Sequence, residues 1–404
     1  MRCEENIDKI YIFFLIIIIF FNEREFYLFK LSNTQDYNIT IILVLVLFLI
    51  SIKKIGLTKT FDLKYMIIIM WIMVFMTMVI SNLAFNQSIT YIIEANRYML
   101  NYILYFSVKS YVQNYKNYNL TIKVLLMAGS CFALLATIQY FTYPNIIILK
   151  GISFAYRFNK IRFFYGFTVV IPSFFILVSY IFKKSSISKK LLTFSVLLLQ
   201  FFYLANITKT RNVMIAVVIT AFVIFLIQKK YRYIYKIIFL VFAVALMLVL
   251  FKDIINDLWE ITVSDTTGTG ESRVNTVDFI LKTIKLSPIL GLGMYSPKFS
   301  LIPSQIHVDV GILGFAFEFG IMGLIWAIVM FIMIIKKMIY IYKKSPEDSY
   351  FFIGYFVYSI AILVFNCLFN FRELIVYFSI IYALLETKYT SIKEIYYFKR
   401  KDTI

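Results

Sequence analysis

Three short groups of residues could carry chemistry in this 404-residue chain. The first is Thr208-Lys209-Thr210-Arg211, and the second runs from Ser272-Arg273 to Ser287-Pro288-Ile289-Leu290-Gly291-Leu292-Gly293. The third joins His307 to Glu318-Phe319-Gly320-Ile321-Met322-Gly323. His307 is the only histidine, and histidine ordinarily titrates near neutral pH, which suits proton transfer. A single histidine excludes a metal site built from histidines.

These groups lie in a chain whose composition is that of a membrane protein. Hydrophobic residues make up 61% of it and charged residues only 16%, with a mean hydropathy of +0.82. A soluble chain would carry charge on about a quarter of its residues. Apolar runs long enough to cross a bilayer recur along the whole length. We therefore expect an all-α polytopic membrane protein, a single integral membrane domain over 1–404 with about twelve transmembrane helices.

The expected spans lie near 8–22, 38–53, 65–85, 89–108, 120–142, 163–182, 190–207, 212–228, 234–251, 310–335, 351–369 and 373–387. The first is short and could lie in the membrane interface instead. The abundant phenylalanine and tyrosine are expected mostly to face lipid or to form the interfacial belt.

Basic residues in the loops predict the orientation. Most lysines and arginines fall at the two termini and in one set of alternate loops, which should face the cytoplasm. Both termini would then be cytoplasmic, and the protein would lie in a bacterial inner membrane. The net charge of +19 follows from these loops and does not require a nucleic-acid partner.

Basic residues on the opposite side are more informative, because topology does not require them there. Arg157 and Arg162 lie in the loop 143–162, and Lys209 and Arg211 in the turn between the seventh and eighth spans. Arg273 lies in the segment 252–309, which is much longer than a connector needs to be.

The 252–309 segment is predicted to be a large extracytoplasmic loop that contains an amphipathic helix near 273–286. Ser272 is a plausible N-cap, and Pro288 would end the helix. Its apolar face would be formed by Val274, Val277, Leu281 and Ile284. Such a helix should lie on the outer membrane surface.

In order and spacing, the three groups resemble the O-antigen ligase/polymerase family, integral-membrane enzymes that join lipid-linked glycans. That family shows a Ser-Arg outside a middle span, an Arg and a Pro-x-x-Gly-x-Gly in a long external loop, and a His before a Glu-x-Gly helix. The resemblance covers roughly residues 190–340. Here Thr210-Arg211 stands where Ser-Arg is usual, and Val308-Asp309 follows the histidine where Asn or Ser is common.

The resemblance implies a GT-C-type membrane glycosyltransferase whose active site lies under the long extracytoplasmic loop. Donor and acceptor would be glycans on undecaprenyl diphosphate in the membrane lipid, with no cofactor and no metal. Arginines would stabilise the departing diphosphate bidentately. The expected catalytic residues are Arg211, Arg273 and His307, and the expected substrate-binding residues are Arg157, Arg162, Lys209 and Glu318.

Several alternatives remain open at this point. Arg211 could be an anchor that snorkels at a helix end, Arg273 a surface residue beside Glu271, and Glu318 the partner of an arginine across the fold. The favoured function is a repeat-unit polymerase for O-antigen, capsule or a related polysaccharide, with a chain-length regulator protein as a further partner. The alternatives are a ligase that transfers the glycan to lipid A-core, and a flippase for lipid-linked oligosaccharides.

Overall fold

The structure is a computed structural model. It describes residues 2–29, 31–58, 60–151, 154–157, 160–163, 166–183, 185–208, 210–228, 269–294 and 310–401. Within these ranges the chain is helical apart from one two-stranded hairpin, which confirms the predicted helical fold. The long helices are α1 (Arg2–Asn22), α2 (Asn33–Leu57), α3 (Lys64–Phe85), α6 (Tyr115–Thr142), α7 (Phe167–Phe182), α8 (Ile187–Phe202), α9 (Arg211–Ile227), α12 (Thr269–Thr283), α13 (Gly311–Lys344), α14 (Pro346–Ala361) and α15 (Arg372–Lys401).

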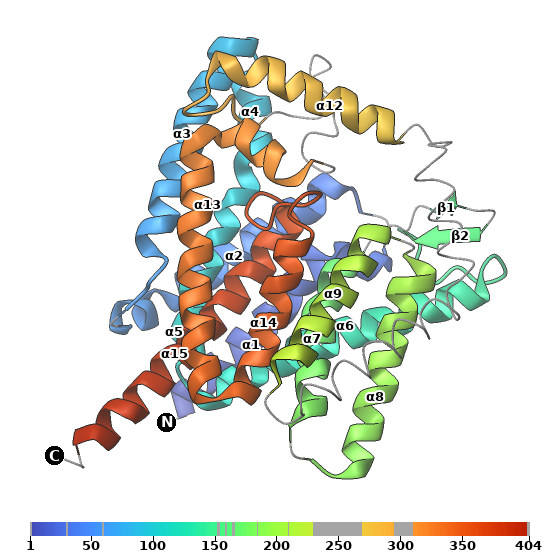
Figure 1. Cartoon of the computed structure of the whole chain (residues 1–404), viewed down its shortest axis with the longest axis vertical. Helices are drawn as coiled ribbons and strands as arrows, with labels where there is room; N and C mark the ends of the chain where they lie inside the picture. The colour runs from blue at the N-terminus through green and yellow to red at the C-terminus, as the bar shows by residue number, and fades with distance from the viewer. Residues whose placement is uncertain are drawn as a thin grey trace.

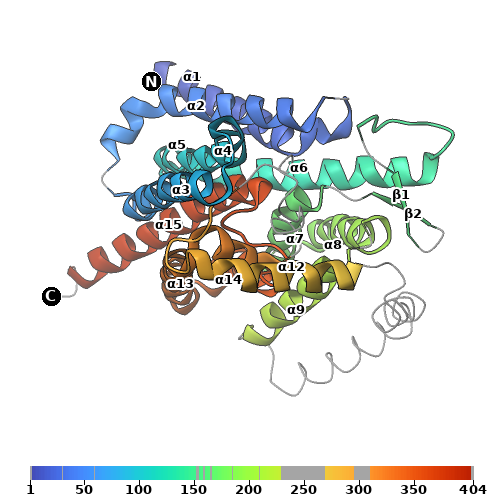
Figure 2. The same cartoon turned by 90° about the horizontal axis from the view of Figure 1, so that it is seen from above.

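The shorter elements are η1 (Arg24–Tyr27), α4 (Ile89–Asn96), η2 (Arg97–Ile103), α5 (Leu104–Val112), β1 (Phe154–Arg157), β2 (Lys160–Phe163), η3 (Tyr203–Ile207) and η4 (Ile284–Leu286). Both termini lie at one end of the bundle, whereas α12 and α4 lie across the opposite end (Figure 1). Figure 2 shows α1 and α2 along one side of the bundle and α13, α14 and α9 along the other.

Five described helices are long and apolar enough to cross a membrane: Thr34–Leu57, Lys64–Phe85, Tyr115–Thr142, Ile187–Ile207 and Gly311–Lys344. Two shorter apolar helices, Phe167–Phe182 and Asn212–Ile227, accompany them. The predicted span 234–251 lies outside the described residues. The chain is therefore a multi-pass membrane protein, and the number twelve stays a prediction.

The segment predicted as a span over 89–108 is helical throughout, but its helix type changes twice. It forms α4, the tighter 3-10 helix η2 and then α5. The Asn96 side chain donates to the carbonyl of Ile92, and side chains of this kind compete with the helical backbone. Within η2, the carbonyl of Met99 accepts from the indole of Trp71. A local side-chain bond and one tertiary bond thus accompany the change of helix type, and hydropathy reveals neither.

The helix predicted over 351–369 also differs from the structure. α14 ends at Ala361, and residues 362–371 form an irregular segment whose members Ile362, Leu368 and Phe369 are buried. An apolar run is equally compatible with a helix and with irregular backbone that the protein itself buries. Hydropathy alone therefore could not locate the break.

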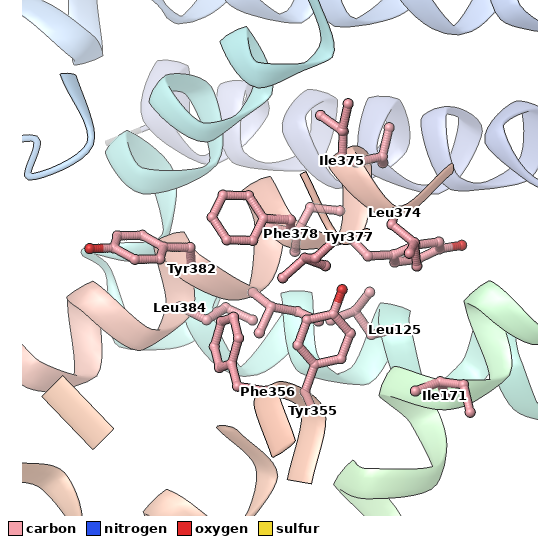
Figure 3. Packing of buried hydrophobic residues seen from close by; sticks show 14 of the residues in the cluster. Leu125, Ile171, Tyr355, Phe356, Leu374, Ile375, Tyr377, Phe378, Tyr382 and Leu384 are labelled. Carbon is pink, nitrogen blue, oxygen red and sulfur yellow. The ribbon is translucent and has the colours of Figure 1, made fainter. Parts of the chain in front are cut away.

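Aromatic side chains form much of the core, contrary to the expectation that they mostly face lipid. Figure 3 shows Tyr377, Phe378 and Tyr382 of α15 among apolar side chains of α6, α7 and α14. Other tyrosines that are fully buried are Tyr11, Tyr102, Tyr105, Tyr111, Tyr203, Tyr355 and Tyr358. An aromatic ring fills a large volume, so these side chains hold α15 among its neighbours.

Candidate functional site

The turn Pro288–Gly293 docks on the kink in α13, so two of the three sequence groups form one unit. Their backbones exchange hydrogen bonds in both directions. The donor and acceptor pairs are Leu292 N to Phe317 O (2.8 Å), Gly293 N to Glu318 O (3.0 Å), Ile321 N to Pro288 O (2.9 Å) and Met322 N to Ile289 O (3.1 Å). The turn therefore satisfies backbone groups that the interrupted helix leaves without helical partners.

Two glycines make this docking possible. Gly320 has φ +61° and ψ −157°, and Gly291 has φ +78°. Residues other than glycine rarely adopt these backbone conformations. A Cβ atom on Gly320 would collide with the backbone of Ile289, and one on Gly291 with the backbone of Glu318. The glycines of both motifs are therefore explained by a close approach of one backbone to the other.

Glu318 is fully buried beneath this unit. Its Oε2 accepts a hydrogen bond from the Nδ2 group of Asn370 at 2.6 Å. Asn370 belongs to the irregular segment 362–371 and lies just after the predicted span 351–369. Glu318 thus ties the motif unit to the segment that precedes α15. Its predicted contact with substrate stays a prediction.

The same irregular segment also supports the beginning of α13. Gly311 N donates to Phe365 O at 3.2 Å, and Ile312 N donates to Leu363 O at 2.9 Å. Gly311 has φ +44° and leaves no room for a Cβ against Leu363. His307 lies outside the described residues, but the helix that follows it begins at Gly311. His307 and Glu318 are therefore not joined by one continuous helix.

The turn that carries Arg211 is built by a change of helix type. α8 ends in the one-turn π-helix η3, a form that is often found at functional sites. The buried Thr208 then donates to Leu204 O at 2.8 Å and accepts from Thr210 N at 3.4 Å. Arg211 is the first residue of α9. Lys209 lies outside the described residues.

The other predicted arginines lie on two further elements. Arg157 ends β1 and pairs in register with Lys160, and Arg162 of β2 pairs with Ala155. Arg273 lies in the first half of α12. The structure describes the backbone of these residues, and their roles stay predictions.

The helix predicted near 273–286 corresponds to α12 and η4, but its start differs from expectation. It begins at Thr269, so Ser272 is not its N-cap. Val274 and Leu281 are exposed, whereas Thr276 and Ile280 are buried and Ile280 packs with Leu292 and Phe317. The helix therefore covers the motif unit with the side that carries Ile280.

Residues 193–328 match the family model described as O-antigen ligase. This match supports membership of the O-antigen ligase/polymerase family. The match begins in α8 and ends in α13, so this family segment includes the Arg211 turn, α12 and the docked motif unit. It covers about a third of the chain. No curated protein matches the chain at a significant level.

Proposed function

We propose that this protein is a polymerase that joins undecaprenyl-diphosphate-linked oligosaccharide repeat units into O-antigen, capsule or a related surface polysaccharide. The observation that carries the proposal is the docking of Pro288–Gly293 on the Gly320 kink, inside the segment that matches the family. This docking gives two family motifs a common structural purpose. Arg273 lies on α12, which packs on this unit, and His307 precedes the start of α13 in the sequence.

The proposed reaction forms one bond and breaks one. The acceptor hydroxyl oxygen bonds to the anomeric carbon of the donor glycan, and the bond from that carbon to the diphosphate oxygen breaks. His307 takes the hydroxyl proton, and the electron pair of the broken bond leaves with the diphosphate. Arg211 and Arg273 bind the charge that develops there, a role for which the planar guanidinium is suited.

The remaining expectations follow from this function. The enzyme would be a metal-independent glycosyltransferase of the GT-C type, with about twelve spans in the inner membrane and both termini in the cytoplasm. Arg157, Arg162 and Lys209 would line the path of the glycan and its lipid diphosphate. A chain-length regulator protein would act with it.

The test is the length of surface polysaccharide in a deletion strain, measured by gel after complementation with matched membrane levels of each variant. The deletion should leave single repeat units, and wild type should restore long chains. Arg211→Ala, Arg273→Ala and His307→Ala should each fail to do so. Lys282→Ala is the matched control, because Lys282 lies on the same helix as Arg273 but pairs with Asp278 at an exposed position.

A ligase is the second candidate, because the matching family is described as O-antigen ligase. It would use the same donor and deliver the finished chain to lipid A-core. Long chains that accumulate on undecaprenyl diphosphate in the deletion strain would identify this activity and contradict the polymerase. Unchanged polysaccharide in the deletion strain would contradict both enzymes and leave transport as the function to test.

A further inference from the structure

A second arginine-rich cluster lies where α1, α2 and α15 meet, outside the segment that matches the family. The Oε1 atom of Glu373 accepts hydrogen bonds from the hydroxyl of Tyr37 (3.0 Å) and from Nε of Arg372 (2.9 Å). Nη2 of Arg24 lies 3.7 Å from the same oxygen and donates to the Tyr37 hydroxyl at 3.2 Å. One carboxylate is thus shared by two arginines.

These contacts hold the Arg372 side chain in place but do not involve all of its hydrogen-bond donors. Its guanidinium carbon lies 3.8 Å from the centroid of the Tyr37 ring, and its side chain is 34% exposed. In the part of the chain that the structure describes, no hydrogen bond occupies its two terminal Nη groups. A guanidinium fixed through Nε and its face presents the remaining N–H donors to a ligand at little entropic cost.

The position of Arg372 is electrostatically unfavourable for a cation. It is the first residue of the 30-residue helix α15, where the helix dipole is positive. Glu373 offsets this in part, but its carboxylate also faces Arg24. An anion at this point would interact favourably with both the guanidinium and the helix end.

The nearby carboxyl groups do not supply that anion in full. Glu23 and Glu25 adjoin Arg24, and burial raises the pKa of Glu23 to about 7. Burial, together with the neighbouring Asp36, raises the pKa of Glu25 to about 8. Both carboxyl groups therefore carry a substantial fraction of neutral form at neutral pH.

Arg372 is also connected to the motif unit. It lies two residues after Asn370, whose amide holds Glu318, and the carbonyl of Glu318 binds Gly293. From this point α15 runs to the end of the bundle where both termini lie (Figure 1). Arg372 therefore lies directly after the segment that supports the motif unit. It is at the end of α15 that is remote from the termini.

We propose that Arg372, with Arg24 behind it, forms an anion-binding site that takes the diphosphate of a lipid-linked glycan. This rests on the proposed function, in which a polymerase holds two lipid diphosphates at once. Arg211 and Arg273 would bind the one that leaves, and Arg372 would bind the one on the acceptor, which stays attached. The acceptor diphosphate stays bonded to its glycan, so it needs to be held in position and not stabilised as a leaving group. A guanidinium with a fixed orientation suits that role.

The direct test is binding of undecaprenyl diphosphate without a glycan to the purified full chain in nanodiscs. Arg211→Ala and Arg273→Ala are present in every protein compared, including the reference, so that only the proposed acceptor site is measured. Arg372→Ala should weaken binding by roughly tenfold to a hundredfold, the range for losing charge-assisted hydrogen bonds. Arg372→Lys should give an intermediate loss, because lysine keeps the charge but not the fork. Tyr37→Phe keeps the ring beneath Arg372 and should cost less than Tyr37→Leu. Lys282→Ala should bind like the reference.

Several outcomes would overturn the proposal in distinguishable ways. Binding by Arg372→Lys and Arg372→Ala within twofold of the reference, at unchanged melting temperature, would exclude Arg372 while leaving the proposed function in place. Loss of binding to an acidic oligosaccharide, with undecaprenyl diphosphate binding intact, would assign the site to a sugar carboxylate instead. If wild type fails to bind undecaprenyl diphosphate and the deletion strain makes normal polysaccharide, the proposed function falls as well.

Discussion

The amide nitrogen of Asn370 donates to the buried carboxylate of Glu318 at 2.6 Å, and this bond joins two segments that hydropathy treats as separate helices. Glu318 lies on the kinked part of α13, and Asn370 on the irregular segment before α15. The two residues hold the motif unit against the element that carries Arg372. A buried carboxylate without its donor is costly, so the pair should control both stability and activity.

Changes to this pair should separate a supporting role from substrate contact. Asn370→Ala removes the donor and should destabilise the fold by about 1–3 kcal/mol, with loss of polymer. Glu318→Gln keeps an oxygen that can accept from Asn370, so stability should stay near wild type. Thermal unfolding and polysaccharide length measured on both variants decide the role. A stable Glu318→Gln protein without polymer would show that the charge itself acts on substrate.

The glycines at the docking point allow a sharp steric test. Gly320→Ala and Gly291→Ala each place a Cβ against backbone and force a residue other than glycine to adopt a positive φ. Each should cost at least about 1–2 kcal/mol and abolish long chains. Gly56→Ala is the matched control, because that glycine lies near the end of α2 with nothing within 4 Å of its Cβ position. Gly56→Ala should be neutral or slightly stabilising. Normal chain length in Gly320→Ala would contradict the docking.

Sequence reasoning located the motifs but not the contacts that join them. Composition and hydropathy were sufficient for the helical membrane fold, because apolar length is a direct requirement of the bilayer. The order of Arg211, Arg273 and the glycine turns was sufficient for the family. The close approach of the backbones at Gly291 and Gly320 could not be predicted, because the two glycines lie on separate elements and the contact involves only backbone atoms.

The Arg372 cluster was missed for a similar reason. In the sequence alone, Arg372 and Glu373 are typical charges at a helix end, and Arg24 is a typical basic residue that flanks an apolar run. Their shared contact with Tyr37 brings together residues from opposite ends of the chain. One signal was present: the sequence predicts that these arginines lie in extracytoplasmic loops, where topology does not require basic residues. Only the fold shows that they converge.

Glu23 should make the stability of the protein depend on pH near neutrality. Burial raises its pKa from 4.5 to about 7, although the hydroxyl of Thr168 donates to it at 2.6 Å. Between these two values the folded state binds more protons than the unfolded state, so stability falls as pH rises from about 4.5 to 7 and then levels off. The full effect of this one group is on the order of 3 kcal/mol.

Glu23→Gln keeps the acceptor for Thr168 and should remove this part of the pH dependence. Melting temperatures of wild type and variant in nanodiscs at pH 5, 6, 7 and 8 give the comparison. The variant should gain on wild type as pH rises. Glu25, with its raised pKa, contributes a slope of the same sign that remains in the variant. Parallel curves for the two proteins would show that Glu23 titrates as an ordinary exposed carboxyl.

The buried ion pair between Lys109 of α5 and Glu386 of α15 should make the opposite end of α15 sensitive to the loss of either charge alone. The two side chains are 2% and 1% exposed, with Nζ and Oε1 3.4 Å apart, and Glu386 also accepts from the Tyr105 hydroxyl at 2.5 Å. Lys109→Met leaves a buried carboxylate without its cation and should cost about 3–5 kcal/mol.

Removing both charges should be far less harmful than removing one. The double variant Lys109→Met/Glu386→Leu should recover much of the lost stability, because neither charge is then buried alone. Lys282→Ala breaks an exposed pair and should cost at most about 0.5 kcal/mol. Unfolding free energies of wild type, Lys109→Met, Glu386→Leu and the double variant form a double-mutant cycle, and Lys282→Ala is its control. Costs that simply add in the double variant would show that the two charges act independently, and α15 would then be held by its aromatic packing alone.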